Sequence, residues 1–162
     1  MTNIDTSLAN IVIGDASSAT AVLGDKNTLD SIGQYHFYSR QGIELLTLTQ
    51  QPGDYLNQIS VFKVEFAGKA DHKYRTLPVD FFASSNGLRL GLPEKQINTR
   101  LGKCFVRRVD SAKNSVELYY RLSLPDDTKT HLLERYNTPI YYARYKLHND
   151  RLVEFEFGFE YP

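Results

Sequence analysis

The sequence predicts an α+β fold made of two tandem repeats, each a short helical segment followed by a three- to four-stranded antiparallel sheet. One observation is a repeated plan: an aliphatic run ending in Gly14 or Gly91 opens each half, and Leu-Gly closes the helical segment at 23–24 and at 101–102. A second observation is that alternating apolar and polar residues, rich in Tyr and Phe, follow each helix, which is typical of half-buried strands. Such self-similarity indicates a duplicated unit.

Both helical segments carry start and stop signals. Asp15 or Ser17 can cap the amides of the first helix, and Gly24 supplies the left-handed residue that ends it. In the second segment Pro93 suits the first helical turn, and Gly102 ends the helix. The apolar residues at positions 97 and 101 fall on one face, which predicts a short helix that packs on a sheet.

Strands are predicted after each helix. Asn149-Asp150 separates the last two, and both residues tolerate the left-handed backbone of a hairpin turn. Residues 77–83 fit either an additional strand or a turn of helix, and a short helix is predicted around 130–135 within the insertion 125–137. The predicted strands are 35–40, 43–49 and 58–66 in the first half and 103–109, 115–124, 139–147 and 151–159 in the second.

The chain is short enough for one domain or for two small ones that share a core, since it has 162 residues. We divide it into a first helix-plus-sheet repeat at 1–66, a connector at 67–86 and a second repeat at 87–162. The alternative is one compact domain that contains both repeats.

Composition indicates an ordinary globular protein and gives no sign of a nucleic-acid partner. Hydrophobic residues make up 41% and charged residues 23%. Lys plus Arg and Asp plus Glu each number 19, so the zero net charge argues against nucleic-acid binding. No apolar stretch is long enough for a transmembrane helix. Residues 1–9 lack the basic segment followed by an apolar segment that is typical of a signal peptide. We expect a cytoplasmic protein as the chain stands, or a periplasmic one if a signal was removed.

Alternation along the last strands assigns their two faces. The predicted core face carries every second residue of three strands. These residues are Val116, Leu118, Tyr120 and Leu122, then Tyr141, Ala143, Tyr145 and Leu147, and then Val153, Phe155, Phe157 and Phe159. The opposite face mixes charges with tyrosine, and it fits either a solvated sheet with paired charges or a protein-binding platform, because Tyr and Arg are enriched at interface hot spots. The candidate protein-binding residues are Tyr119, Arg121, Tyr142, Arg144, Lys146, Glu154 and Glu156.

Residues with catalytic or metal-binding chemistry are scattered. The four histidines, among them His72 and His131, lack the spacing of a zinc site, and no triad or pair of catalytic carboxylates is evident. Asp126-Asp127 suits a helix cap better than a cation site. Cys104 is predicted to be a buried, inert thiol at the start of a strand. We therefore predict no enzyme activity, no cofactor, no metal and no small-molecule substrate.

A family resemblance rests on the second half. The spacing of its aliphatic, glycine and proline positions resembles the signature of the SmpA/OmlA-like outer-membrane assembly lipoproteins, and it is similar to the related fold of the β-lactamase inhibitory proteins. The resemblance implies a tandem, non-enzymatic scaffold that binds another protein. The pattern is Leu88-x-Leu90-Gly91-Leu92-Pro93, then Ile97, then Leu101-Gly102.

The function expected from these observations is protein recognition. One version is an inhibitor or immunity protein that blocks a bacterial toxin or enzyme. The alternatives are a structural partner in envelope assembly and a small-ligand binding protein with a site between sheet and helices. The sequence leaves open the partner, the oligomeric state, the role of Cys104, and whether the sheet face or the loops carry binding.

Overall fold

The computed structural model describes residues 3–24, 30, 32–68, 73–125 and 131–160. These residues form an α+β fold with a small two-stranded sheet, a mixed eight-stranded sheet and three helices. In chain order the elements are β1 (Ser7–Leu8), β2 (Ile11–Val12), α1 (Ala16–Leu23), β3 (Gln34–Tyr38), β4 (Glu44–Thr49), β5 (Val61–Phe66), β6 (Arg75–Thr76), α2 (Glu94–Leu101), β7 (Val106–Asp110), β8 (Ser115–Ser123), α3 (Leu132–Tyr136), β9 (Ile140–His148) and β10 (Arg151–Glu160).

Strands β3 to β10, which come from both halves, join in one sheet. Its order is β6-β3-β4-β5-β10-β9-β8-β7, so the last strand of each half lies at the centre. β5 and β10 pair antiparallel from Glu65↔Glu154 to Val61↔Gly158. The short β6 runs parallel to β3 at the far edge, which makes the sheet mixed. The two predicted antiparallel sheets are thus continuous through the β5–β10 pair.

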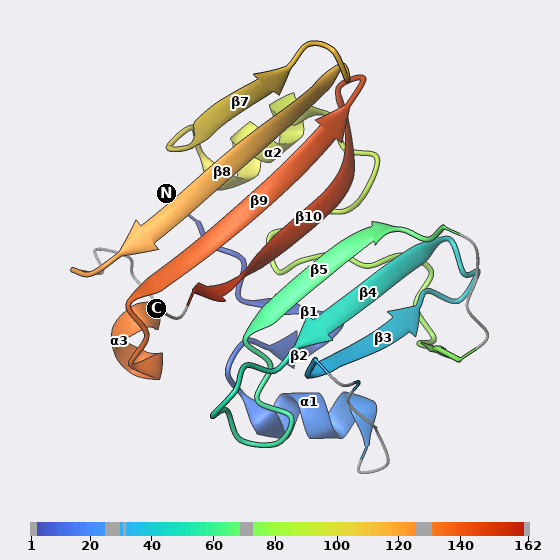
Figure 1. Ribbon diagram of the computed structural model, residues 1–162, viewed down its shortest axis with the longest axis vertical. Coiled ribbons are helices and arrows are strands. Elements are labelled where there is room, and N and C mark those ends of the chain that lie inside the picture. Colours follow the sequence, from blue (N-terminus) through green and yellow to red (C-terminus); the bar gives the residue numbers. More distant parts are fainter. Residues whose placement is uncertain (1–2, 25–29, 31, 69–72, 126–130, 161–162) are drawn as a thin grey trace.

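Helices and the N-terminal segment lie on one side of this sheet, and Figure 1 shows the strands β7–β10 in front of α2 with no element over their near side. Tyrosines of the covered side reach the elements packed on it. The Tyr141 hydroxyl donates to the Asp5 carbonyl at 2.8 Å, the Tyr145 hydroxyl to Asp5 Oδ2 at 2.8 Å, and the Tyr120 hydroxyl to the Gly102 carbonyl at 2.9 Å. Buried tyrosines therefore satisfy their polar ends while their rings fill the core.

The helix signals in the sequence are confirmed. Asp15 caps α1 by accepting the Ser17 amide at 3.0 Å, and the Gly24 amide bonds to the Thr20 carbonyl beyond its last turn. α2 begins one residue after Pro93 and ends before Gly102, with its 97 and 101 side chains fully buried. The third helix also forms, at 132–136, although residue 130 of its predicted range lies outside the described residues.

Three local predictions need correction or completion. Val153 was expected in the core, but a register irregularity between Leu152 and Glu154 leaves Leu152 buried and Val153 only half-buried. A bulge changes the alternation of side chains, so a strict period of two fails there. Residues 77–83 form neither helix nor strand, although Leu77 and Phe82 are buried. The β1–β2 hairpin has no counterpart among the predicted strands.

The junction of the two halves depends on close contact between β5 and β10. Phe62 and Phe157 stack across it with ring centres 5.0 Å apart. A Cβ at Gly158 would come within 2.4 Å of the Ser60 carbonyl oxygen and 2.8 Å of Val61 Cα. Only glycine lets the backbones approach this closely.

Candidate functional site

The sheet side opposite the helices, called the outer face below, holds all seven residues singled out from the sequence. Strand register places Tyr119 beside Arg144, Arg144 beside Glu156, and Glu156 beside Lys63 of the first half. These residues form one row across the strands, and a second row of side chains runs beside that row from one half of the chain to the other. Its members, across β8, β9, β10 and β5, are Glu117, Lys146, Glu154 and Glu65.

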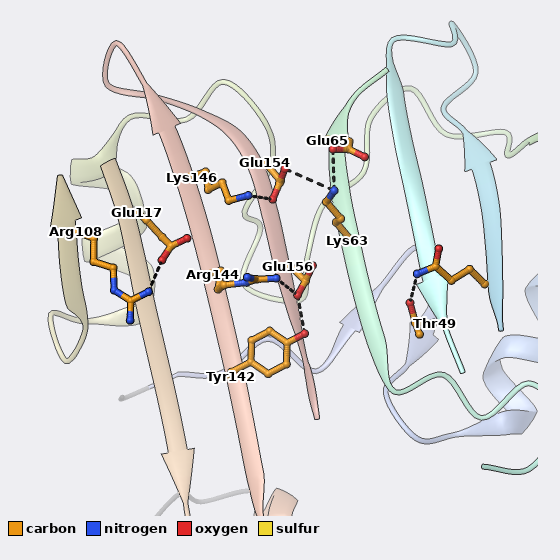
Figure 2. A network of polar contacts seen from close by, with 11 residues as sticks. Thr49, Lys63, Glu65, Arg108, Glu117, Tyr142, Arg144, Lys146, Glu154 and Glu156 are labelled. Atoms are coloured by element: carbon orange, nitrogen blue, oxygen red, sulfur yellow. Dashed lines mark hydrogen bonds and ion pairs between the residues drawn. The ribbon is translucent and has the colours of Figure 1, made fainter. Parts of the chain in front are cut away.

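Ion pairs connect neighbouring strands on the outer face, as Figure 2 shows. Lys146 Nζ lies 2.6 Å from Glu154 Oε1. Lys63 Nζ lies 3.6 Å from Glu154 Oε2 and 2.9 Å from Glu65 Oε2, so one cation bridges two carboxylates that face each other across the β5–β10 junction. Partial burial alone would raise the pKa of Glu154, but the two ammonium groups outweigh it and hold that pKa below its ordinary value.

A second polar group surrounds Glu156. Its Oε1 accepts Arg144 Nη2 and the Tyr142 hydroxyl, both at 2.6 Å. Burial raises the pKa of Tyr142, and so does the negative charge of Glu156. Arg144 Nε is buried without a hydrogen-bond partner among the described residues. The guanidinium is therefore held by one carboxylate oxygen and lies 5.7 Å from the centre of the Tyr142 ring.

A hollow of about 330 Å³ opens beside these groups. Three of its lining residues, Tyr119, Tyr142 and Arg144, come from the predicted set. Arg121 lies near it, with Nε 3.9 Å from Glu160 Oε2, and Glu160 is itself part of the lining. Gln51, from the other half of the chain, and Phe159 also line the hollow.

Sequence reasoning thus found part of the outer face and missed part. Lys146, Glu154 and Glu156 lie on it but belong to the ion-pair network and not to the hollow. Glu160 follows the same alternation as Glu154 and Glu156, so its place on this face could have been predicted. Gln51 could not, because no signal in the sequence says that it comes to rest beside the second half.

Buried carboxylates elsewhere support the fold. Asp5 is fully buried, and its Oδ1 accepts both the backbone and side-chain nitrogens of Asn86 at 3.0 Å. Glu44 is buried at the start of β4, where its Oε2 accepts the Phe82 amide at 2.6 Å. Burial raises the pKa of Glu44, and the Phe82 amide and the charge of Arg89 only partly offset the effect. Each carboxylate holds a distant segment against the sheet.

The remaining candidates do not gather into a site. Cys104 is exposed, so the prediction of a buried thiol is wrong: the chain leaves α2 at the surface, and the residue precedes β7, whose side chains are all exposed. His131 lies at the start of α3, where its Nδ1 is 3.3 Å from Glu134 Oε2. His72 and Asp126-Asp127 lie outside the described residues. Within the described part of the chain no three His, Cys, Asp or Glu side chains are grouped as metal ligands.

Comparisons with models of protein families, with curated proteins and with solved structures find no match to this chain. In the described part of the chain, no helix combines the length and the hydrophobicity required to cross a bilayer.

Proposed function

We propose that this protein is a non-enzymatic module that binds another protein through the outer face of its sheet. The observation that carries the proposal is the hollow lined by Tyr119, Tyr142 and Arg144 on a face that Figure 1 draws without a covering element. Tyr and Arg are, with Trp, the side chains enriched at interface hot spots. A hollow of this size accommodates one or two partner side chains and leaves the surrounding ion pairs as a polar rim.

The rival interpretation is a solvated sheet whose charges only pair with each other. Most charges of the outer face do have partners, and exposed pairs of this kind contribute little to stability. The rings of Tyr119 and Tyr142 favour the binding interpretation, because a solvated face needs no aromatic wall around a hollow. The two interpretations differ in whether the face is covered in the cell.

We also propose that the two halves are a tandem duplication, which would fit the same function. In each half a short helix that ends at glycine precedes a run of antiparallel strands. The final strands β5 and β10 pair antiparallel at the centre, as expected if a local two-fold axis relates two copies of one unit. A duplicated unit would explain how a chain of this length builds so broad a sheet. Superposition of 10–66 on 88–160 would test the duplication directly.

Two specific roles fit such a module: an inhibitor or immunity protein that covers a bacterial toxin or enzyme, and a structural partner in envelope assembly. A toxin gene beside the gene for this protein would favour the first role, and an exported mature chain would favour the second. A small-ligand protein is the alternative function, since the hollow could also hold a small molecule. It has less support, because the space between sheet and helices is filled by packed rings such as Tyr145 and Phe155.

In-cell photo-crosslinking tests the proposal. A photoreactive phenylalanine replaces Arg121, which is exposed beside the hollow, in the organism that naturally makes the protein. The matched control places it at Lys113, which is also exposed, in the β7–β8 turn. We expect a discrete protein adduct from position 121 and none from position 113. Equal or absent adducts at the two positions would contradict a binding role for the outer face.

A further inference from the structure

Strand β7 lies at one edge of the large sheet, and it is the longer of the two edge strands. In the described part of the chain it pairs with β8 on one side and with no strand on the other (Figure 1). All five of its residues, Val106–Asp110, are exposed. The backbone N–H and C=O groups along a free edge can pair with another extended chain. The edge of β7 is therefore the place where this sheet can gain a strand.

The two edges of the sheet differ in how they are protected from such pairing. The other edge strand, β6, has only two residues, and a very short edge strand offers few groups to pair with. β7 contains no proline and its register with β8 is unbroken, so neither a missing donor nor a bulge interrupts its edge. Its valines are also in solvent, since Val106 is 56% exposed and Val109 is 58% exposed. An open edge with exposed apolar side chains favours association.

Two arginines at the centre of β7 are held against the two faces of the sheet and leave its edge open. Arg107 lies on the covered side, where its Nε and Nη2 donate to Glu94 of α2 at 3.1 and 3.2 Å. Arg108 lies on the outer face, where its Nη1 donates to Glu117 Oε1 at 3.2 Å. Each guanidinium keeps further N–H donors. The arginine side chains are 44% and 65% exposed and both glutamates are 21% exposed, so positive charge faces the solvent here.

Charge selects an acidic occupant for this edge. Residues 103–110 contain three basic side chains, Lys103, Arg107 and Arg108, and one acidic side chain, Asp110. A second copy of the chain fits less well, because identical edge strands related by a two-fold axis run antiparallel. Any register centred on the arginines then places an arginine of one copy opposite an arginine of the other. Like charges directly opposite each other destabilise a pair of strands.

We propose that β7 binds an extended acidic segment of a partner protein, which joins the sheet as an additional strand. The run from Val106 to Val109 is apolar-basic-basic-apolar and reads the same in both directions. An apolar-acidic-acidic-apolar segment therefore complements it in either orientation. Adjacent residues of a strand point to opposite faces, so each acidic side chain of the partner meets one arginine. The inference goes beyond the proposed function, because it assigns a site to the sheet edge and requires no contact with the hollow.

Titration of the full chain with three synthetic peptides tests the complementarity. The peptides are identical except for their cores, which are Val-Glu-Glu-Val, Val-Lys-Lys-Val and Gly-Glu-Glu-Gly. We expect the first to bind with a Kd below about 1 mM, the second not to bind, and the third to bind at least about threefold more weakly because it lacks the valines. Sodium chloride should weaken the first complex, since exposed charges are screened. No binding of the first peptide, or equal binding of either control peptide, would overturn the inference.

Amide hydrogen exchange distinguishes strand addition from binding by charge alone. The backbone N–H groups of a strand point alternately to its two sides, so every second amide of β7 faces the free edge. We expect those amides to exchange at least about threefold more slowly near saturation with the Val-Glu-Glu-Val peptide. Binding without this protection would overturn the inference. Protection that rises with protein concentration alone would identify a second copy on the edge and would overturn the choice of an acidic partner.

A pair of matched substitutions locates the peptide on the chain. Arg108→Gln removes one positive charge from the edge. Arg40→Gln is the control, because Arg40 is 58% exposed and also forms an ion pair at 3.2 Å, with Asp80, in the other half of the chain. We expect Arg108→Gln to weaken binding of the Val-Glu-Glu-Val peptide at least about threefold and Arg40→Gln to leave it unchanged. Circular dichroism melts establish that both variants are folded. Equal effects of the two substitutions would overturn the inference.

The two proposals can fail separately. The crosslinking experiment reports contacts of position 121 beside the hollow, whereas the peptide experiments report contacts of residues 106–109 at the edge. Lys113, the crosslinking control, lies in the turn after β7 and outside the edge contact. A discrete adduct from position 121 together with no peptide binding would overturn the edge site and leave the proposed function standing. Peptide binding at the edge with no adduct from position 121 would do the reverse.

Discussion

Replacing Phe157 by alanine tests how the two halves of the sheet are held together. The side chain is fully buried and stacks on Phe62 with an angle of 14° between the rings. Phe62 belongs to β5 and Phe157 to β10, so the contact spans the junction at the centre of the sheet. Truncation leaves a cavity at a place where the backbones on either side are already paired and cannot collapse into it.

The expected loss follows from the buried area. A phenylalanine of this kind removes about 150–250 Å² from water, and at about 25 cal/mol per Å² the whole residue contributes roughly 4–6 kcal/mol. Alanine retains part of that contribution, so we expect Phe157→Ala to lower the free energy of unfolding by about 3–5 kcal/mol. In a chain of this size such a loss lowers Tm by roughly 10 °C.

Urea unfolding followed by circular dichroism measures the change, with Tyr119→Ala as the control. Tyr119 is half-buried on the outer face, and we expect its loss to cost less than about 1 kcal/mol. A double-mutant cycle with Phe62→Ala should give a coupling of about 0.5–1.5 kcal/mol for the stacked pair. The assignment of core and outer faces is refuted if Tyr119→Ala destabilises the protein more than Phe157→Ala.

The other predictions concern the junction and the carboxylates. Gly158→Ala should destabilise the protein by about 1–3 kcal/mol in urea unfolding, because its Cβ meets backbone atoms, whereas Gly68→Ala, with nothing within 4 Å, should change little. Lys63→Met should cost about 1 kcal/mol at neutral pH. That deficit should shrink in melts below pH 4.5, because Glu154, with its lowered pKa, contributes stability that is lost as pH falls through its folded-state pKa. Glu44 has a raised pKa in the folded state. Its contribution to the free energy of unfolding is therefore complete below pH 4.5 and is lost as pH rises through its folded-state pKa. Glu44→Gln should remove this part of the pH dependence of unfolding, and an unchanged profile would contradict the assignment.

Patterns within single elements made the secondary structure predictable. The caps of α1 and the burial of one side of α2 follow from residues within a few positions of each other. The alternation in β9 assigned its faces correctly, since every second residue from Tyr141 to Leu147 is buried. Asn149-Asp150 does form the turn between β9 and β10, with both residues at positive φ. In each case the determining forces act over one helical turn or one strand, so the sequence states them directly.

Contacts between distant segments were not predictable in the same way. The bulge that turns Val153 away from the core depends on how β10 pairs with β9. The exposure of Cys104 depends on where the chain leaves α2. The hollow needs Gln51 of one half beside Tyr142 of the other. None of these has a local signature, because pairing and packing free energies depend on which strands become neighbours.

By itself, then, the chain determined an α+β protein with two short capped helices, strands of known face, and a mixed tyrosine and charge pattern along the last strands. Tertiary structure decided that these strands form one continuous sheet through β5 and β10, and that Gln51 of the first half lines a hollow with Tyr142 of the second. The physical reason is the sequence separation over which each interaction acts. Hydrogen-bond caps and side-chain alternation involve near neighbours in the sequence. The close approach at Gly158 exists only once both halves have folded against each other.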